Sequence, residues 1–383
     1  MKRIKNGASL LFLTIVFLTA CATPTIAPES YSLSDEVLLR AKPLAGETDV
    51  PELNDTNVLA LDQGMQMFLD EHVNRAHGRT LKLHELLHAI ITEGSFGLEY
   101  DEITRTAQET FNARLGNCLS FTNMFVAMAR EVGIEVTYQE VEIPPSWSRE
   151  VHTYVLSRHV NINVDLGAGG SREVDFNIDD FQSSYDRRLI SDERALAHYY
   201  SNIGVEYLQN NNPLEALRYF RKAMTSDNEF APAWSNLGAL FSQAGHFRYA
   251  EAAYIRALRI NPRELVAMSN LGQLYDHLGQ TELADWYNRQ SNRHRMRNPY
   301  YRYHLARSAF LAKDYDTAIG HLKYAVRKKK SEDTFYFLIG LSYLKKGDDS
   351  TARRWLEKAE RMAEDDGLKR NYHNKLERLL DAR

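Results

Sequence analysis

A 34-residue period in the carboxyl-terminal half is the feature that most restricts how this chain of 383 residues can fold. Four glycines recur on that period, Ala306 occupies the remaining slot, and an alanine follows each of the five positions by twelve residues. Because alanine makes up roughly a tenth of the chain, five alanines in phase are on the order of a one-in-100,000 coincidence. The period therefore predicts helical pairs that stack into a solenoid. The glycines are Gly204, Gly238, Gly272 and Gly340, and the alanines are Ala216, Ala250, Ala284, Ala318 and Ala352.

One period carries a motif in the order Trp234, Leu237, Gly238, Phe241, Ala250, Tyr254, Ala257 and Pro262. This order resembles the tetratricopeptide repeat, in which small residues let paired helices approach and aromatic residues fill the space between them. The resemblance implies an all-α solenoid of five repeats, followed by a capping helix over residues 367–383. The third repeat departs most, with Asn288 and Ser291 in place of an aromatic residue and an alanine, so we expect its second helix to pack loosely. The repeats span residues 197–230, 231–264, 265–298, 299–332 and 333–366.

The first three repeats share a Ser-Asn-(Ile/Leu)-Gly tetrapeptide that places Asn202, Asn236 and Asn270 in phase. The apolar residue beside each Asn points between helices, so the Asn is expected to face the inner surface of the superhelix. A carboxamide offers donors and an acceptor to an extended peptide backbone, which makes these residues candidates for binding a peptide or protein. An Asn that merely tolerates a wet concave surface explains the pattern equally well. Repeats four and five carry His304 and Leu338 instead and are left for a different contact.

The amino terminus has the order of a secretory signal, with Lys and Arg in residues 1–5, an apolar run over residues 8–17, and Leu-Thr-Ala before Cys21. The ending resembles the bacterial lipobox, which implies a signal peptide over residues 1–20 and a lipid anchor on Cys21. A polar tether follows over residues 21–34. Ala22 resembles the residue that follows the cysteine in outer-membrane lipoproteins, so we expect a bacterial envelope protein that faces the periplasm. An ordinary signal peptide with an incidental cysteine is the alternative.

Charge and cysteine content restrict the partners and the chemistry. The chain carries 47 Lys and Arg against 51 Asp and Glu, a formal charge of −4, and no run of like charge is longer than residues 327–330. Nucleic acid is therefore not expected as a partner. With Cys21 assigned to a lipid, the second cysteine, Cys118, has no partner for an intramolecular disulfide.

Cys118 lies in the stretch Gly-Asn-Cys-Leu-Ser-Phe at residues 116–121, at the start of an apolar helical pattern that ends at Gly133. Gly116 and Asn117 predict a turn, which places Cys118 in the first turn of a helix. Free backbone N–H groups and the helix dipole favour a thiolate there, and the thiolate is the nucleophilic form of cysteine. A small buried side chain without reactivity is the alternative.

A nucleophilic cysteine needs a base within hydrogen-bond reach and an acceptor that orients this base. Strands are predicted over residues 135–141, 151–156, 159–166 and 173–176, and the hairpin formed by the last two brings Asp175 alongside His159. His152, in the preceding strand, is a competing base. The backbone N–H of Cys118 is a candidate donor to an oxyanion.

The order Cys118, His159, Asp175 on helix, strand and strand resembles the transglutaminase-like superfamily, relatives of papain-type cysteine peptidases. The resemblance implies an α+β domain of cysteine-protease type over residues 35–190, with these three residues as the catalytic triad and no cofactor. Helices are expected before the triad near residues 58–74, 81–92 and 104–113. Many members carry Trp two residues after the histidine and Pro after the aspartate, where this chain has Asn161 and Phe176.

A second motif, HExxH, is formed by His84, Glu85 and His88 on a predicted helix. Zinc peptidases use the two histidines to bind the metal and the glutamate to activate water. A third ligand is missing from the usual spacing, and Glu93 and Glu109 are the nearest candidates. Alternatively, the leucines and isoleucines of this helix form an apolar stripe that faces the core, and the motif lies on the solvent-exposed side of an ordinary helix. We expect the helix to bind no metal and to pack this stripe against the Cys118 helix.

Three functions follow from these patterns. A cysteine enzyme would hydrolyse or transfer an amide on a peptide or protein that the repeats recruit. A catalytically silent scaffold would only bind partners, and a zinc peptidase would use residues 84–88. Rapid labelling of Cys118 by an electrophile well below pH 8 separates the first two, and metal analysis tests the third.

Overall fold

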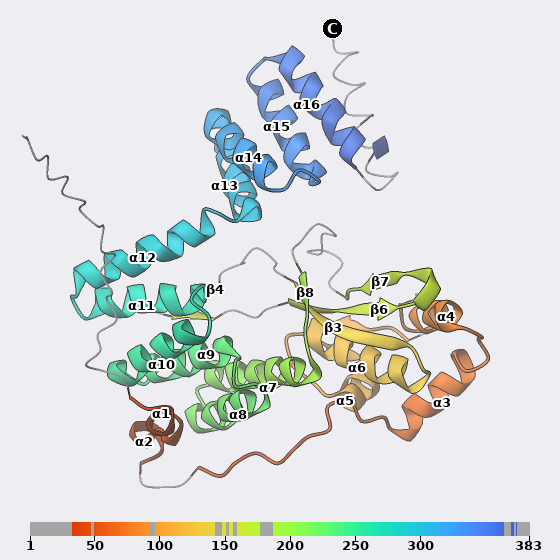
Figure 1. Cartoon of the computed structure of the whole chain (residues 1–383), viewed down its shortest axis with the longest axis vertical. Coiled ribbons are helices and arrows are strands. Elements are labelled where there is room, and N and C mark those ends of the chain that lie inside the picture. The colour runs from red at the N-terminus through yellow and green to blue at the C-terminus, as the bar shows by residue number, and fades with distance from the viewer. Residues whose placement is uncertain are drawn as a thin grey trace, which may run out of the picture. The chain divides into compact units, whose positions relative to one another are not determined.

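The computed structural model of the chain describes residues 33–46, 50–91, 96–141, 148–150, 153–155, 159–176, 187–363, 369–370 and 373 (Figure 1). The predicted leader, Cys21 and the tether up to residue 32 lie outside these residues, as do Glu93, His152 and most of the predicted capping helix. Within the described part of the chain, no helix is both long and apolar enough to cross a membrane.

Helices precede a small antiparallel sheet in the amino-terminal part. They include α3 (Gln63–His72), α4 (Arg79–Ile91), α5 (Ala107–Ala113) and α6 (Cys118–Glu131). The sheet has the order β7-β6-β3-β8, formed by Ser171–Val174, His159–Asp165, Glu135–Val141 and Arg187–Leu189. Shorter pairs are β1 (Glu99–Tyr100) with β2 (Leu115–Gly116) and β4 (Ser148–Glu150) with β5 (Thr153–Val155). The mixed α/β architecture predicted from the sequence is confirmed.

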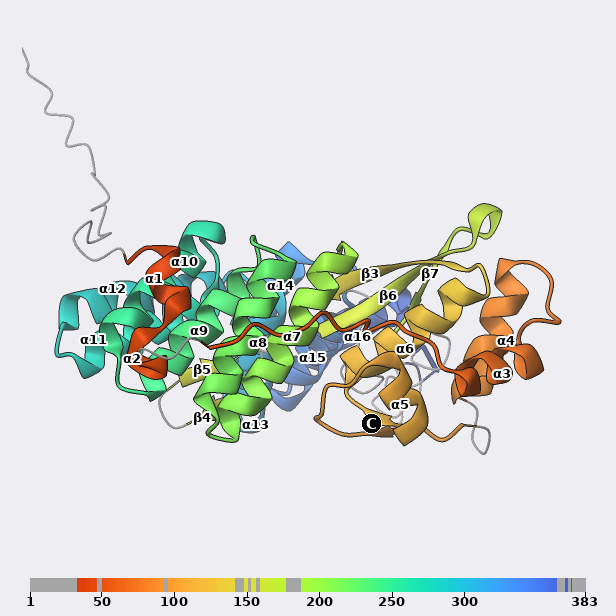
Figure 2. The same ribbon diagram turned by 90° about the horizontal axis from the view of Figure 1, so that it is seen from below.

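The sheet packs against α6 because alternate residues along β6 are apolar. Val160, Ile162 and Val164 are almost fully buried and belong to the same hydrophobic core as the apolar side chains of α6. Tyr138 of β3 reaches that helix, where its hydroxyl donates to Asn123 Oδ1 at 2.8 Å. Figure 2 shows α6 beside β3 and β6. This packing determines where the first turn of α6 lies relative to the start of β6.

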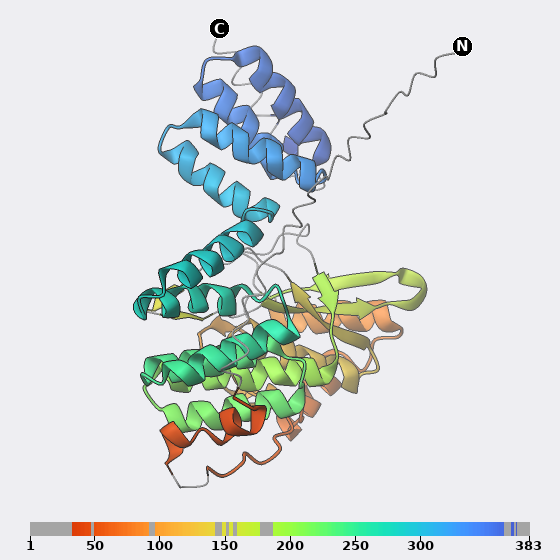
Figure 3. The ribbon, with the colours of Figure 1, turned by 60° about the vertical axis from the view of Figure 1, so that its left-hand side comes forward.

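Paired helices form the carboxyl-terminal part and follow one another along the solenoid, as the period predicts (Figure 3). The all-α solenoid predicted from the sequence is confirmed. The pairs are α7 (Asp192–Gln209) with α8 (Pro213–Ser226), α9 (Ala231–Gln243) with α10 (Phe247–Ile260), α11 (Leu265–His277) with α12 (Thr281–Arg295), α13 (Pro299–Leu311) with α14 (Tyr315–Lys328), and α15 (Asp333–Lys345) with α16 (Asp349–Met362).

Glycines of the period lie where the two helices of a pair come closest. A Cβ atom at Gly204 would lie 2.5 Å from the ring of Phe220, and one at Gly238 would lie 2.5 Å from the ring of Tyr254. Small and aromatic residues therefore recur together because each ring occupies the space that a side chain on the facing helix would need.

Gly238→Ala should lower the free energy of unfolding by about 2 kcal/mol, because the added methyl group overlaps the buried ring of Tyr254. Gly320→Ala is the matched control, since no atom lies within 4 Å of where its Cβ would be in helix α14. The free energy of unfolding of this control should rise by about 0.5–1 kcal/mol, because alanine has a higher helix propensity than glycine. Urea unfolding followed by circular dichroism measures both variants, and equal effects would show that the helix crossing does not require glycine.

The hydrophobic core of the solenoid is divided between the third and fourth repeats. One cluster extends from the α/β part of the chain to Tyr287 of α12, and a separate cluster begins at Tyr300 of α13. The buried residues of α12 are Ala284, Tyr287 and Ser291, which leaves most of this helix exposed or half-buried. This sparse core agrees with the departures that distinguish the third repeat in the sequence.

Residues 33–46 and 50–55 pack on the solenoid, although the sequence assigned residues 35–190 to one α/β domain. In α1 (Asp35–Arg40), Asp35 pairs with Arg256 of α10 at 2.9 Å. α2 (Lys42–Ala45) lies against α8, whose Arg221 donates to Leu39 O at 2.6 Å. The sequence missed this placement because two short helices carry too few apolar residues to show which surface they cover.

One buried carboxylate joins the first repeat to the sheet. Glu140 of β3 is 8% exposed and accepts hydrogen bonds from Arg194 at 3.1 Å and from His198 at 2.8 Å, both on α7. Arg188 of β8 contacts the same carboxylate at 2.7 Å. Arg194 also pairs with Asp227, 2.7 Å away at the end of α8. A single acidic side chain thus holds together two strands and the first helix of the solenoid.

Candidate active site

The sequence Gly-Asn-Cys-Leu-Ser at residues 116–120 builds the start of helix α6. Asn117 is the N-cap, since its Oδ1 accepts from the backbone N–H of Ser120 at 2.9 Å while its Nδ2 donates to Thr104 Oγ1 at 2.8 Å. A Cβ at Gly116 would lie 2.6 Å from the Cβ of Ser120, so glycine is required there. Cys118 is the first residue of the helix, where backbone N–H groups have no acceptor within the helix.

The β6–β7 hairpin brings His159 and Asp175 together. Ile162 pairs with Val174, so one residue further along the hairpin Asp175 comes opposite Asn161 and diagonal to His159. Asp175 Oδ2 lies 2.6 Å from His159 Nε2, and each of these side chains is 5% exposed. A charge-assisted contact between two buried groups orients the imidazole ring.

Cys118 is the third group, because it hydrogen-bonds to the ring of His159. Asp175 contacts Nε2, so the contact with Cys118 falls to Nδ1. Burial disfavours the charged form of His159, but the hydrogen bonds and charges of Asp175 and Cys118 outweigh burial and raise the pKa of His159 from 6.5 to about 9. At neutral pH, His159 is therefore an imidazolium that lies between Cys118 and Asp175.

Asn161 is a further member of this site, which the sequence analysis treated only as a departure from the family pattern. Its Nδ2 donates to Asp175 Oδ2 at 2.9 Å, the same oxygen that contacts His159. The residue is fully buried, and its Oδ1 has no hydrogen-bond partner among the residues that the structure describes. Asn161 faces the same way as His159 because it lies two residues further along the strand. That spacing is the signal by which the sequence could have identified it.

Asn161→Ala should slow the alkylation of Cys118 by about tenfold at pH 6, because Asp175 loses a buried charge-assisted donor and orients His159 less strictly. Peptide mapping by mass spectrometry measures the rate. Asn163→Ala is the matched control, since Asn163 lies on the same face of β6 but pairs with Glu173, away from Asp175. A rate that falls equally in both variants would assign the effect to the strand and not to the contact with Asp175.

Aromatic side chains border these residues. The Phe176 ring centroid lies 6.0 Å from that of Phe121 and 5.8 Å from that of Phe125, so Phe176 anchors the end of β7 on α6. Tyr100 pairs with Gly116 in the β1–β2 ladder, and partial burial together with the nearby charge of Cys118 raises its pKa. The Tyr100 phenol therefore lies near Cys118.

The HExxH residues lie on the outer side of α4. The rings of the exposed His84 and His88 are stacked with centroids 6.1 Å apart, and His84 Nδ1 lies 3.5 Å from the carboxylate of the half-buried Glu85. Among the described residues, no three His, Cys, Asp or Glu side chains are grouped to hold a metal ion. Glu109 caps helix α5 through Thr106. That this helix binds no metal stays a prediction, while its Leu83, Leu86 and Ile90 share the core that contains α6.

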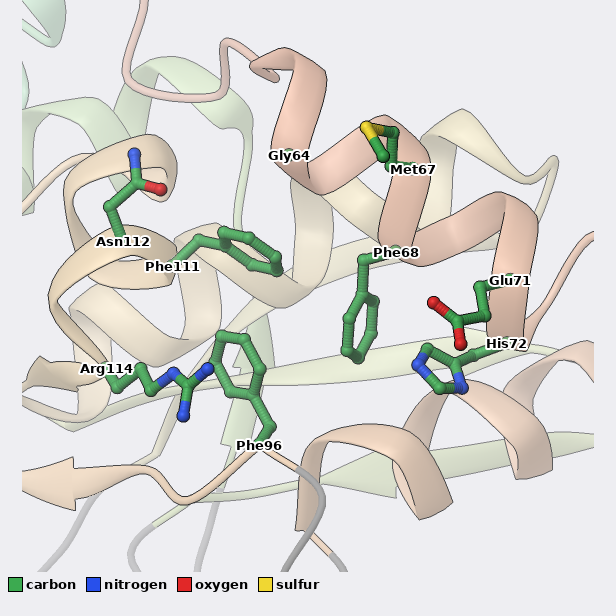
Figure 4. Close-up of a pocket in the computed structure, with 9 residues that line it drawn as sticks. All are labelled: Gly64, Met67, Phe68, Glu71, His72, Phe96, Phe111, Asn112 and Arg114. Atoms are coloured by element: carbon green, nitrogen blue, oxygen red, sulfur yellow. The ribbon is translucent and has the colours of Figure 1, made fainter.

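A cavity of about 390 Å³ between α3 and α5 does not include the three triad residues in its lining (Figure 4). The Phe68 ring lies 5.4 Å from that of Phe96 and 5.5 Å from that of Phe111. The Arg114 guanidinium lies 5.2 Å from the centre of the Phe96 ring, while Glu71 and His72 border the α3 side. This lining combines aromatic rings with polar and charged side chains but holds no nucleophile with an oriented base.

The asparagines predicted to bind peptide have partners within the solenoid. Asn236 is buried and donates to Ser201 Oγ at 3.0 Å, and Asn270 is buried and hydrogen-bonds to Tyr254. Asn202 is half-buried. β5 lies against α9 and α11, the helices that carry the two buried asparagines. A peptide that binds Asn236 and Asn270 would have to replace their present contacts, so this role stays a prediction.

Known protein families match both parts of the chain. The family described as the transglutaminase-like superfamily matches residues 67–159, a span that contains Cys118 and ends at His159. Asp175 lies beyond it. Families described as the tetratricopeptide repeat match residues 197–230, 236–292 and 303–367. A search of curated protein sequences found no match.

Solved structures similar to the chain include several proteins with helical repeats. YrrB, described as a TPR protein with an unusual peptide-binding site, is 20% identical over 46% of this chain and 92% of its own, with a TM-score of 0.25. PilF of Pseudomonas aeruginosa is 19% identical over 49% of this chain and 94% of its own, with a TM-score of 0.27. MamA of Desulfovibrio magneticus RS-1 is 20% identical over 45% of this chain and 96% of its own, with a TM-score of 0.25.

Proposed function

Since the chain contains a transglutaminase-like domain at residues 67–159 and tetratricopeptide repeats within residues 197–367, we propose that it hydrolyses or transfers an amide by cysteine catalysis. The substrate is a peptide or protein that the repeats recruit. The hydrogen-bonded order Cys118, His159, Asp175 is the observation that supports this activity. No cofactor takes part in the proposed reaction.

In the first half of the reaction, the Cys118 sulfur attacks the amide carbonyl and forms a C–S bond. The negative charge that develops on the carbonyl oxygen is stabilised by the backbone N–H of Cys118 at the start of α6. The C–N bond then breaks while His159 Nδ1 gives its proton to the departing amine. A thioester on Cys118 and a neutral His159 remain, and Asp175 keeps the ring in place.

In the second half, water or an amine attacks the thioester carbonyl. His159 takes a proton from this nucleophile, the C–S bond breaks, and the thiolate leaves. The products are an acid if water attacks and a new amide if an amine attacks. The Cys118 thiolate and the His159 imidazolium are thereby restored.

Casein with a biotin-labelled alkylamine tests the proposal. Transfer would attach biotin to casein, and hydrolysis would release ammonia or new amino termini. Either signal should vanish in Cys118→Ala and persist in Cys21→Ser, which removes the other cysteine. A signal that is unchanged in Cys118→Ala would exclude Cys118 as the nucleophile.

A catalytically silent binding protein is the second candidate, and the length of the solenoid favours it. In that case Cys118 would react with electrophiles no faster than an ordinary thiol.

We also propose that a lipid on Cys21 holds the protein at the bacterial envelope. The charged, apolar and small-residue order of residues 1–21 supports this anchor. Cys21→Ser should then move the protein from the membrane fraction to the soluble fraction.

A further inference from the structure

Positively charged residues are concentrated around the junction of the third and fourth repeats. Residues 289–330 contain twelve Lys and Arg but only two Asp and Glu. Because the whole chain has 47 basic and 51 acidic residues, the remainder holds 35 basic and 49 acidic ones, a formal charge of −14. The contrast is hard to see in the sequence because the basic residues are spaced through three helices and their connections and form no run longer than four residues.

Three of these cations gather around one ring in the fourth repeat. The Arg302 guanidinium lies 4.4 Å from the centre of the Tyr324 ring, while the Arg327 guanidinium and the Lys328 ammonium approach it to 5.6 and 5.9 Å. Arg302 is held in place, since its Nε donates to Met296 O at 2.9 Å and its Nη1 donates to His321 Nδ1 at 3.0 Å. A guanidinium fixed in this way loses little entropy when it binds a planar carboxylate.

More cations surround His294 at the end of α12. Burial and the charges of Arg297, Arg263 and Arg293 lower the pKa of His294. The two groups adjoin, because Arg302 donates to the carbonyl of Met296, two residues after His294. We call Arg263, Arg293, Arg297, Arg302, Arg327 and Lys328 the basic cluster.

Within the part of the chain that the structure describes, no carboxylate pairs with a member of the basic cluster. Other surface cations do have such partners, such as Arg130 with Asp192 and Arg353 with Glu357. Arg263, Arg293, Arg297, Arg327 and Lys328 are exposed, and Arg302 is half-buried. Six like charges that are close together and uncompensated repel one another, so an anion that binds there relieves this repulsion.

We propose that the basic cluster binds an acidic peptide segment of a partner protein. The tetratricopeptide repeat family matches residues 236–292 and 303–367 on either side of the junction, and a repeat solenoid suits a protein or peptide ligand. Charge complementarity supports a short segment over a long polyanion, because nucleic acid or an anionic membrane would extend onto the remaining surface, which carries the net negative charge. The cluster occupies the point where the two solenoid cores separate, between Tyr287 and Tyr300. This binding does not depend on the chemistry of Cys118.

Fluorescence anisotropy of a labelled Glu-Gly peptide with the full chain tests this proposal. We expect binding that weakens as the salt concentration rises from about 0.05 to 0.3 M, because added ions screen the cluster. Arg327→Gln with Lys328→Gln should weaken binding about tenfold, and adding Arg302→Gln should weaken it further. The first two side chains are exposed, so the fold is expected to be unaffected, and circular dichroism checks this point.

Arg75→Gln with Arg172→Gln is the matched control, since it removes the same charge from exposed positions in the α/β part. Its affinity for the peptide should stay within about twofold of the unsubstituted chain. Equal losses in both double variants, or no binding of the peptide at all, would overturn the proposal. So would tighter binding of single-stranded DNA or of phosphatidylglycerol vesicles with the same dependence on Arg327 and Lys328.

Discussion

His159→Gln will slow the alkylation of Cys118 by iodoacetamide at pH 6 by about two orders of magnitude. The pKa of His159 is raised to about 9, so the ring carries a positive charge at pH 6 and favours the thiolate beside it. Without that charge, a thiolate beside the ring is no longer stabilised, and an ordinary thiol is only about 0.3% ionised at this pH. Mass spectrometry of the labelled peptide over time measures the rate.

The matched control is His152→Gln, which removes the histidine that competed for the same role in the sequence. Its alkylation rate should match that of the unsubstituted chain. The rates of the unsubstituted chain and of His159→Gln should also converge as the pH rises through about 9, where His159 loses its proton. Slow labelling in His152→Gln with normal labelling in His159→Gln would reverse the assignment of the base.

The same shift makes stability depend on pH. Since the pKa of His159 is about 9 in the folded chain and 6.5 as its ordinary value, folding favours the protonated ring. This contribution is complete below pH 6.5 and is lost as the pH rises through about 9.

Glu140→Ala should lower the free energy of unfolding by about 3–5 kcal/mol. The substitution leaves Arg194 and His198 without the buried carboxylate that accepts from both. It also removes the contact that ties β3 to α7, so the loss acts on the sheet and on the first repeat together. Urea unfolding, followed by tryptophan fluorescence and by circular dichroism, measures the effect.

Glu135→Ala is the control on the same strand. Glu135 is exposed and pairs with Arg79, so its loss should cost less than about 1 kcal/mol. Glu140→Gln keeps the shape of the side chain but removes its charge. Its loss in the free energy of unfolding should lie between those of Glu140→Ala and Glu135→Ala. If Glu140→Ala were no more harmful than Glu135→Ala, the buried carboxylate would not hold the sheet and α7 together.

Local patterns predicted most of the candidate site. Gly116 and Asn117 meet Ser120 through contacts no more than four residues apart, so the local sequence places Cys118 at a helix start. The contact of Asn117 with Thr104, thirteen residues earlier in the chain, depends on the tertiary structure. The length of the β6–β7 hairpin and its alternation placed His159 near Asp175. Their assignment as a catalytic triad stays a prediction until activity is measured.

The period of small and larger residues likewise determined the solenoid, because each glycine and the side chain that packs against it belong to one repeat, with a ring opposite Gly204 and Gly238. Only the tertiary structure decided the remaining features. It gave Asp175 a second donor in Asn161, surrounded Glu140 with Arg188, Arg194 and His198, and moved residues 33–46 and 50–55 onto the solenoid. It also brought the dispersed cations of residues 263–328 into one cluster. Each of these depends on which faces of separate elements meet, and that choice is made by the burial of apolar surface between segments far apart in the chain.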